Sequence, residues 1–348
     1  MRVQHIPVHG AVVETSPVAD FQLKPMDFTS LAAKAIEEDR LTDEECRAVL
    51  CVPDEDVLAL LSAAYSVRKT FCGNKVHIHV LMNAKSGLCP EDCNYCSQSK
   101  ISTADISKYG MVSRDRLLEG AWAAKEAKAK RFCIVASGRG PSWGEIEYLS
   151  EAVRTIRDEV GIKVCCSVGL LDEPKAKALK DAGVDQLNHN LNTSEEFYSE
   201  ICTTHTYQDR LDTLRAARSA GLNLCTGAIF GMGESDGDVI DTLMALRDLT
   251  PQSIPINFLI PIEGTPLQDV HRLTPYQCLR ILCLARFLNP RQEIRISGGR
   301  EFHLRSRQAM ALYPANSLFV EGYLTTPGQS TKDAWQLIED MGFEIQLD

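Results

Sequence analysis

The sequence predicts an α/β fold, namely a TIM-type (β/α)8 barrel with an N-terminal helical extension. The main observation is an alternation of short β-rich runs with longer helical stretches, which begins near residue 75. Eight such runs occur, and a parallel barrel of about 250 residues needs eight strands. The chain has 348 residues, which leaves room for extensions at both ends. A doubly wound open sheet also alternates, but eight units over this length favour closure.

The strand candidates divide the chain into four parts. Residues 1–27 are expected to be a flexible lead, and residues 28–72 a helical extension in which Thr42 and Glu45 form a capping box. Residues 73–325 are expected to form the barrel, and residues 326–348 a C-terminal helix and tail. The predicted strands span residues 75–83, 131–138, 163–169, 184–190, 222–231, 253–261, 293–299 and 316–322.

The composition is that of an ordinary folded protein with an acidic charge balance. Hydrophobic residues make up 44% of the chain, and 37 basic against 47 acidic residues give a net charge of −10. A protein that binds nucleic-acid phosphates presents clustered positive charge, so that class is disfavoured. No stretch reaches the roughly 18 apolar residues of a membrane span, and the N-terminus lacks the pattern of a secretion signal. We therefore expect a cytoplasmic protein that binds neither nucleic acid nor membrane.

Cysteine is the unusual feature of this composition. The chain has 13 cysteines, an odd number scattered along a sequence with no sign of export. Disulfides are rare inside cells, so metal ligation or catalysis is the better explanation for some of them. Several others, Cys202 among them, fall in helical or connecting segments, where core packing or surface exposure is the default role.

The alternation of side chains along each predicted strand identifies the residues that face the barrel lumen. Apolar residues mark the helix-facing side of a strand, so their neighbours point inward. Cys166 falls on the helix-facing side and is expected to pack there. Barrel interiors are normally filled by Val, Ile and Leu. Here the inward set is polar and contains sulfur, which indicates a site: Cys133, Cys165, Asn188, Asn190, Cys225, Asn257 and Arg295.

A Cys-x3-Cys-x2-Cys loop follows the first predicted strand and is the most informative motif. Its thiols are Cys89, Cys93 and Cys96. Three thiolates on so short a loop can hold three irons of a [4Fe–4S] cluster and leave the fourth open to a small molecule. Structural zinc is the alternative, but zinc prefers a fourth Cys or His at regular spacing. The nearby His77 and His79 lie on the preceding strand and are expected to be packed or solvated.

This loop, with the aromatic Tyr95 before its last cysteine, resembles the signature of the radical S-adenosylmethionine superfamily. In that superfamily the open iron chelates S-adenosyl-L-methionine, and one electron cleaves it to methionine and a 5′-deoxyadenosyl radical. The resemblance places Tyr95 near the adenine. Such a radical must be kept from water, and a barrel lumen provides that enclosure.

The resemblance extends to one family. The stretches NAKSGLCPEDCNYCSQS, QLNHNLNTS, TYQDRLDT, SIPINFL and EIRISGGRE are similar to the biotin synthase family over roughly residues 40–345. This resemblance implies a homodimeric sulfurtransferase that inserts sulfur between two saturated carbons of dethiobiotin. It also implies a second cluster, [2Fe–2S], that serves as the sulfur donor. The matching ligand positions are among those that the alternation turns inward: Cys133, Cys165, Cys225 and Arg295.

Further site residues carry over position by position. Arg210 in TYQDRLDT matches the residue that pairs with the methionine carboxylate, a bidentate task that suits a guanidinium. Asn190 and Asn192 match contacts to the ribose or methionyl part of the cofactor, although some relatives have an aspartate at the second position. Asn188 and Asn257 match contacts to the ureido ring of dethiobiotin, where an amide offers both a donor and an acceptor.

Arg295 is an unusual ligand, because a guanidinium normally stays protonated. A weak fourth ligand would suit a cluster that is meant to be dismantled. The acidic net charge is compatible with an electron donor of the flavodoxin or ferredoxin type but does not predict one. The alternatives are another enzyme of the superfamily without a sacrificial cluster, an iron–sulfur electron carrier or sensor, and a structural zinc protein.

Overall fold

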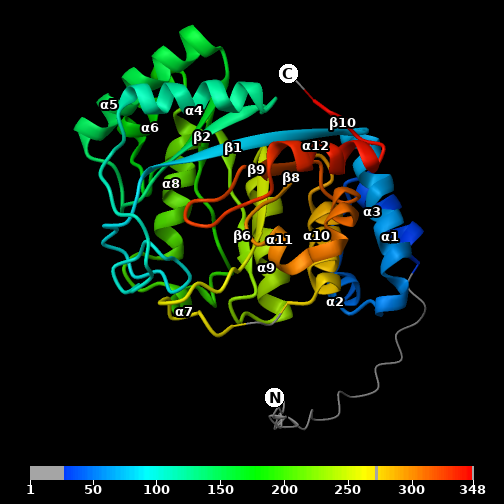
Figure 1. The fold of residues 1–348 in the computed structure, drawn as a ribbon. Helices are drawn as coiled ribbons and strands as arrows, with labels where there is room; N and C mark the ends of the chain where they lie inside the picture. The colour runs from blue at the N-terminus through cyan, green and yellow to red at the C-terminus, as the bar shows by residue number, and fades with distance from the viewer. Residues whose placement is uncertain (1–26, 271–272, 347–348) are drawn as a thin grey trace, which may run out of the picture.

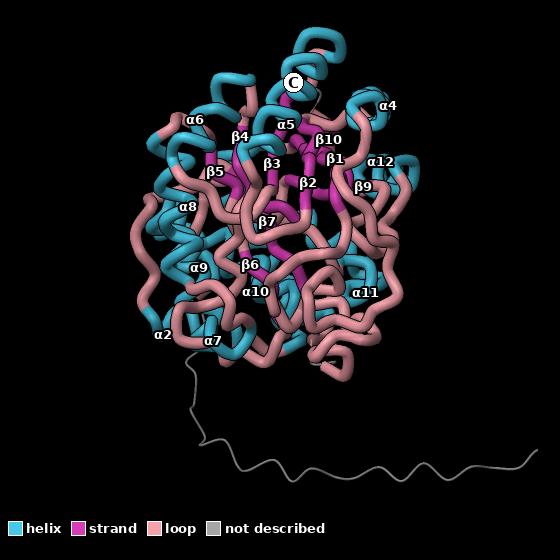
Figure 2. The backbone as a smooth tube through the Cα atoms, turned by 90° about the vertical axis from the view of Figure 1, so that its left-hand side faces the viewer, coloured by secondary structure: helices cyan, strands magenta, loops and turns pink. Residues whose placement is uncertain are grey.

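The computed structural model describes residues 27–270 and 273–346, so the predicted lead lies outside the described residues except for Asp27. The predicted barrel is confirmed: parallel strands form a closed ring at the centre and helices surround it (Figures 1 and 2). In chain order the strands are β1 (Lys75–Lys85), β2 (Arg131–Ala136), β3 (Lys163–Ser167), β4 (Gln186–Asn188), β5 (Asn223–Cys225), β6 (Ala228–Phe230), β7 (Ser253–Phe258), β8 (Glu293–Ile296) and β9 (Ser317–Val320).

Closure of the barrel depends on the pairing of its first and last strands. Residues His77 to Val80 of β1 pair with Ser317 to Val320 of β9. The remaining pairs around the ring join strands that are consecutive in the chain, if β5 and β6 are counted as one strand. The predicted fifth strand is divided into β5 and β6, which occupy one place in the ring and both pair with β7. Gly227 lies at this break, and a Cβ there would collide with the carbonyl oxygen of Pro255. The sequence did not predict the short strand β10 (Glu344–Ile345), which pairs with the start of β1.

The surrounding helices follow the strands as a barrel requires. The predicted capping box of Thr42 and Glu45 is present at the start of the helix Asp43–Leu50 in the N-terminal extension. Several of the surrounding helices also begin with a capping box, so their first turns are satisfied locally. These helices are α4 (Arg114–Glu126), α5 (Trp143–Thr155), α6 (Glu173–Ala182), α7 (Tyr198–Ile201), α8 (Tyr207–Ser219), α9 (Asp236–Leu249), α10 (Pro275–Leu288), α11 (Arg300–Leu304) and α12 (Thr331–Asp340).

The N-terminal extension is a set of three α-helices on one side of the barrel. They are α1 (Phe28–Ile36), α2 (Asp43–Leu50) and α3 (Val57–Cys72). Figure 1 shows them next to α10, which α1, α2 and α3 all contact. From Cys278 to its end α10 is buried, and it therefore has the barrel on one side and the extension on the other. Within the described residues, no helix is long and apolar enough to cross a membrane.

Candidate active site

One cavity in the barrel collects almost all of the predicted site residues. It has a volume of about 390 Å³ and lies within the ring and under the loops that follow the strands. The loop thiols, the asparagines, Tyr95 and Arg210 line it, and Cys133, Cys165 and Arg295 line it from the strands. Cys225 is the one predicted site residue that does not line it, because Cys225 is fully buried beside Asn188.

The cysteine loop is held by two hydrogen bonds, one within its own segment and one to α7. The Gln98 side chain accepts a hydrogen bond from Gly87 N at 2.9 Å, and Asn94 N donates to Ile201 O at 2.9 Å. Cys89, Cys93 and Cys96 thereby share one wall of the cavity. Burial raises the pKa of Cys89 and raises that of Cys96 to about 11, so without a metal the two thiols keep their protons near neutral pH.

Tyr95 and Asn192 contact each other next to the cysteine loop. The Asn192 amide donates to the Tyr95 hydroxyl at 2.6 Å. The backbone of Asn192 has φ +75°, a left-handed conformation that asparagine and aspartate adopt more readily than other side chains. The type of residue at this position is therefore restricted by the backbone as well as by the site.

Arg210 lies in the first turn of α8, and the cation is buried. Its guanidinium donates to Asn190 O at 2.9 Å, to the Tyr198 hydroxyl and to His205 Nε2 at 2.9 Å. Burial opposes its charge, but the phenol groups of Tyr95 and Tyr198 outweigh burial and raise its pKa. A buried, permanently charged guanidinium at the cavity wall is suited to an anionic group such as a carboxylate.

The two asparagines predicted to contact the substrate are held differently. Asn188 donates to Asn190 Oδ1 at 3.2 Å and to the Cys225 sulfur at 3.3 Å. Asn257 bridges two backbone segments, donating to Ala228 O at 3.0 Å and accepting from Gly298 N at 3.0 Å. These bonds leave the carbonyl oxygen of Asn188 and the second amide hydrogen of Asn257 available. Asn188 can therefore accept from a cyclic urea, and Asn257 can donate to one.

The three inner cysteines form a separate group deeper in the barrel. Cys133 and Cys165 are opposite each other on β2 and β3, and Cys225 lies on β5. The thiols pack with one another and with Leu81 and Phe319, apart from the main apolar core. Cys166 belongs to that main core instead, as the alternation predicts. Hydrogen bonds to both neighbours raise the pKa of Cys165, whereas the bond from Cys165 and the charge of Arg295 lower that of Cys225.

Arg295 contacts this thiol group from β8, but its charge is matched by a carboxylate. Its Nη1 lies 3.6 Å from the Cys225 sulfur, and its Nη2 lies 2.5 Å from Glu293 Oε1. Burial opposes the charge of Arg295, while Cys225 and Glu293 favour it and raise its pKa. His77 and His79, predicted to be packed or solvated, are both buried and both contact Glu293. In this structure Arg295 is therefore a protonated hydrogen-bond donor toward sulfur.

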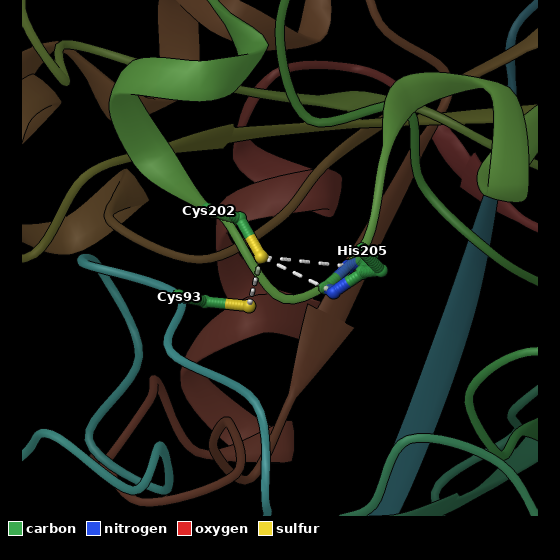
Figure 3. A group of neighbouring side chains, drawn as sticks. All are labelled: Cys93, Cys202 and His205. Atoms are coloured by element: carbon green, nitrogen blue, oxygen red, sulfur yellow. Dashed lines mark hydrogen bonds between the residues drawn. The ribbon is translucent and has the colours of Figure 1, made fainter.

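The structure also places residues at the site that the sequence analysis did not assign to it. Cys202, expected to have a packing or surface role, lies 3.8 Å from the Cys93 sulfur (Figure 3). The Cys93 thiol donates to it, and this bond lowers the pKa of Cys202 to about 4. His205 lies beside Cys202, and Glu91 accepts from His205. The Cys-x2-His spacing of Cys202 and His205 is the signal that could have indicated them.

These residues fit the iron–sulfur chemistry that the sequence predicts. The loop supplies three soft thiol donors that face a cavity large enough for a nucleoside, which suits a [4Fe–4S] cluster with one iron open. The inner group supplies three more thiols in mutual contact and a cation that balances their charge. Thiolate ligands of this kind are typical of iron–sulfur clusters.

Comparisons with known proteins define the class. A model of the radical SAM superfamily matches residues 85–246, and one of the Biotin and Thiamin Synthesis associated domain matches residues 255–344. Methylornithine synthase has the same fold, with a TM-score of 0.80 and 22% identity over 91% of this chain and 97% of its own. A FeFe-hydrogenase maturase from Carboxydothermus hydrogenoformans has a TM-score of 0.77, with 18% identity over 92% and 79% of the two chains. The fold, the cysteine loop and the superfamily match define a radical S-adenosylmethionine enzyme.

Curated relatives narrow this class. The biotin synthase of Acaryochloris marina is 54% identical, over 88% of this chain and 89% of its own. That of Bacillus subtilis strain 168 is 51% identical, over 92% of this chain and 95% of its own. The chain belongs to the biotin synthase family. It is a sulfurtransferase that acts on dethiobiotin, and its superfamily implies a [4Fe–4S] cluster and S-adenosyl-L-methionine as cofactors.

Proposed function

We propose that two groups of thiols at two depths of one cavity divide the work of sulfur insertion. Cys89, Cys93 and Cys96 hold the [4Fe–4S] cluster, and Cys133, Cys165 and Cys225 hold a second cluster of the [2Fe–2S] type. When bound, the first supplies the electron that cleaves S-adenosyl-L-methionine to a 5′-deoxyadenosyl radical, and the second supplies the sulfur. The observation that carries this proposal is that the inner thiols contact one another at the base of the same cavity that the loop thiols line.

The residues between the two groups position cofactor and substrate. Arg210 pairs with the methionine carboxylate, exchanging its present bond to Asn190 O for the stronger charged one. Tyr95, Asn190 and Asn192 contact the adenosyl and methionyl groups, supported by the direct Tyr95–Asn192 hydrogen bond. The barrel walls exclude water from the space where hydrogen is abstracted.

Asn188 and Asn257 hold the ureido ring of dethiobiotin at the inner group. Asn188 donates to the Cys225 sulfur and to Asn190, so it contacts both the inner thiols and a residue of the proposed cofactor site. A substrate bound to Asn188 would therefore lie between the radical source and the sulfur source. Arg295 contributes a positive charge beside Cys225, and the Glu293 carboxylate favours this role over ligation by a neutral guanidine.

The test compares two products in two proteins. The wild type and a triple variant, Cys133→Ala with Cys165→Ala and Cys225→Ala, are purified without oxygen, and their iron and sulfide are measured. Each is incubated with a low-potential reductant, S-adenosyl-L-methionine and dethiobiotin. The proposal expects deoxyadenosine and biotin from the wild type, but deoxyadenosine alone from the variant, with iron and sulfide reduced to one cluster.

Other results would overturn parts of the proposal. Biotin formation by the triple variant would remove the inner group as the sulfur source. Deoxyadenosine without biotin from the fully loaded wild type would leave the loop assignment intact and refute the substrate contacts. Full iron content and turnover in Arg295→Ala would show that the inner cluster does not need the positive charge of Arg295.

The assembly and location of the enzyme complete the proposal. We infer a homodimer, as the family resemblance implies, that lies in the cytoplasm and receives electrons from a flavodoxin- or ferredoxin-type protein. Sedimentation of the loaded protein tests the dimer, with a monomer as the contradicting result. Deoxyadenosine formation with reduced flavodoxin or ferredoxin in place of a chemical reductant tests the donor.

A further inference from the structure

Cys202 is a buried thiol that the proposed reaction does not use. It follows α7, comes from a segment far from the cysteine loop in the sequence, and lies directly behind Cys93. It is not among the residues that line the cavity, whereas Cys93 and His205 are. Figure 3 shows Cys93, Cys202 and His205 pointing toward one common centre.

The spacing of these three side chains matches a tetrahedral metal ion. Two thiolates at zinc–sulfur distances of about 2.3 Å in tetrahedral geometry are about 3.8 Å apart. The Cys93 and Cys202 sulfurs are 3.8 Å apart, and the Cys202 sulfur lies 3.1 Å from His205 Nδ1 and 3.9 Å from His205 Nε2. One ligand atom from each residue lies within 4.8 Å of the other two. Two thiolates and one imidazole are ligands that suit zinc.

A carboxylate orients the histidine for this task. Glu91 Oε2 lies 2.5 Å from His205 Nδ1 and also accepts from the Thr204 hydroxyl at 2.7 Å. Such a bond keeps the proton on Nδ1 and leaves the lone pair of Nε2 free, the arrangement found behind metal-ligating histidines. At present Arg210 donates to that lone pair at 2.9 Å. A metal ion would take the place of this bond.

We propose that Cys93, Cys202 and His205 form a zinc site of the cluster-free chain, which withholds Cys93 from the [4Fe–4S] cluster. Binding forms two zinc–sulfur bonds and one zinc–nitrogen bond and releases to solvent the proton that Cys93 donates to Cys202, so no oxidant or reductant is needed. A water molecule completes the four ligands, reached through the cavity that Cys93 and His205 line. The inference rests on the proposed role of Cys93 as a cluster ligand, because only then do zinc and cluster exclude each other.

The competing explanation is that zinc binds the loop motif itself, through Cys89, Cys93 and Cys96. The chain offers a matched pair of variants that separates the two sites. Cys202→Ser removes a ligand of the proposed site and leaves the loop motif whole. Cys89→Ser removes a ligand of the loop motif and leaves the proposed site whole.

The experiment titrates Zn²⁺ into the full chain prepared without iron or sulfide, in competition with a coloured chelator. Co²⁺ is titrated in parallel, because its absorption reports tetrahedral thiolate ligation. The proposal expects Cys202→Ser to lower zinc affinity at least about a hundredfold, more than the tenfold to hundredfold loss typical of a residue behind a ligand. Glu91→Gln is expected to show that smaller loss. Cys89→Ser is expected to bind zinc like the wild type.

A second measurement separates this inference from the assignment of the loop. Iron and sulfide are added to each protein with and without bound zinc, and cluster formation is followed by its visible absorption. Zinc is expected to slow cluster formation in the wild type at least about tenfold and to have no effect in Cys202→Ser, which assembles the cluster normally. Normal cluster formation in Cys89→Ser would instead refute the loop assignment.

The zinc inference is overturned if Cys202→Ser keeps wild-type zinc affinity or if Cys89→Ser loses it, since zinc would then lie on the loop motif. Far-ultraviolet circular dichroism of each variant shows that it is folded. If Cys202→Ser were unfolded, Glu91→Gln would still decide the matter, because it keeps every ligand: unchanged zinc affinity in that variant would contradict the proposed histidine orientation.

Discussion

The loop thiols line the same cavity as two of the inner thiols, Cys133 and Cys165, but the two groups are positioned by different means. Cys89, Cys93 and Cys96 follow the carboxyl end of β1 on one short loop, so their mutual distances depend on local backbone geometry. Cys133, Cys165 and Cys225 lie on three strands, so their distances depend on strand register. A loop can adapt around a cofactor that binds a small molecule, whereas strands fix a group at a set depth. The difference suits a cofactor that exchanges ligands in one case and a sulfur source held beside the substrate in the other.

The largest effect should come from the loop. Cys96→Ala removes one of the three proposed cluster ligands, so formation of both deoxyadenosine and biotin should fall at least about a hundredfold. The loss of a residue that only supports a ligand typically costs less, about tenfold to a hundredfold. The amounts of deoxyadenosine and biotin formed by the reduced protein measure this effect. Cys51→Ala is a control at an exposed cysteine that does not line the cavity, and it should leave both products unchanged. If Cys96→Ala still formed deoxyadenosine, the loop would not be needed for the cleavage of S-adenosyl-L-methionine.

Adjacent cysteines on β3 offer a sharper contrast between site and core. Cys165→Ser removes an inner thiol and should abolish biotin formation while deoxyadenosine is still released. Cys166→Ser changes the neighbouring residue, which faces the apolar core, and should keep both products. Its free energy of unfolding should fall by about 1–3 kcal/mol, because a hydroxyl is buried there without a partner. Product assays and urea unfolding test both, and equal loss of biotin in the two variants would contradict the inward and outward assignment.

The buried carboxylate beneath the inner thiols should matter for stability. Glu293→Gln leaves Arg295 and its other cationic neighbours without a negative charge, which should lower the free energy of unfolding by about 3–5 kcal/mol. Glu196→Gln, at an exposed position, should change it by less than about 0.5 kcal/mol. Denaturant unfolding measures both, and a similar small change in the two would mean that the Glu293 charge is not needed.

The same carboxylate predicts a pH dependence. Burial opposes the charge of Glu293, but His79 and Arg295 outweigh it and hold the pKa of the carboxyl well below its usual value. A lowered carboxyl pKa stabilises the fold above the unfolded-chain pKa of about 4.3. This contribution is lost as the pH falls from there toward the lower folded pKa. Wild-type stability should therefore fall more steeply in acid than that of Glu293→Gln, and parallel curves would refute this.

The smallest effect concerns Asn192 near the loop. Asn192→Asp retains a residue that tolerates the left-handed backbone and adds a charged acceptor for ribose hydroxyls, as in some relatives. We expect the KM for S-adenosyl-L-methionine to fall roughly threefold to tenfold, since a charged hydrogen bond is worth about 1 kcal/mol more than a neutral one. Initial rates of deoxyadenosine formation measure it. An increased KM would argue against a ribose contact.

Much of this architecture was predictable because it depends on local patterns. The barrel prediction is confirmed, since β-rich runs and helical periodicity are read from neighbouring residues. Strand alternation placed Cys133 and Cys165 on the inner face and Cys166 on the outer one. The roles of these residues in binding clusters, cofactor and substrate remain predictions.

The unpredicted features depend on contacts between distant segments. Cys202 reaches Cys93 only because the segment after α7 packs on the cysteine loop, where Asn94 N donates to Ile201 O. No local pattern encodes that docking. Glu293 is a different case, because it lies two residues before Arg295 on β8 and therefore shares its inward face. Applying the alternation to every charged residue of the strand would have found it.

Barrel closure has a consequence for the order in which the protein matures. The loop thiols come from one short segment near the start of the barrel sequence, so they are available early in synthesis. The inner group needs Cys133 from β2 and Arg295 from β8, and its walls close only when β9 pairs with β1. Contacts between such distant segments form late in folding. The nascent chain can thus present the three loop thiols long before it has an inner chamber.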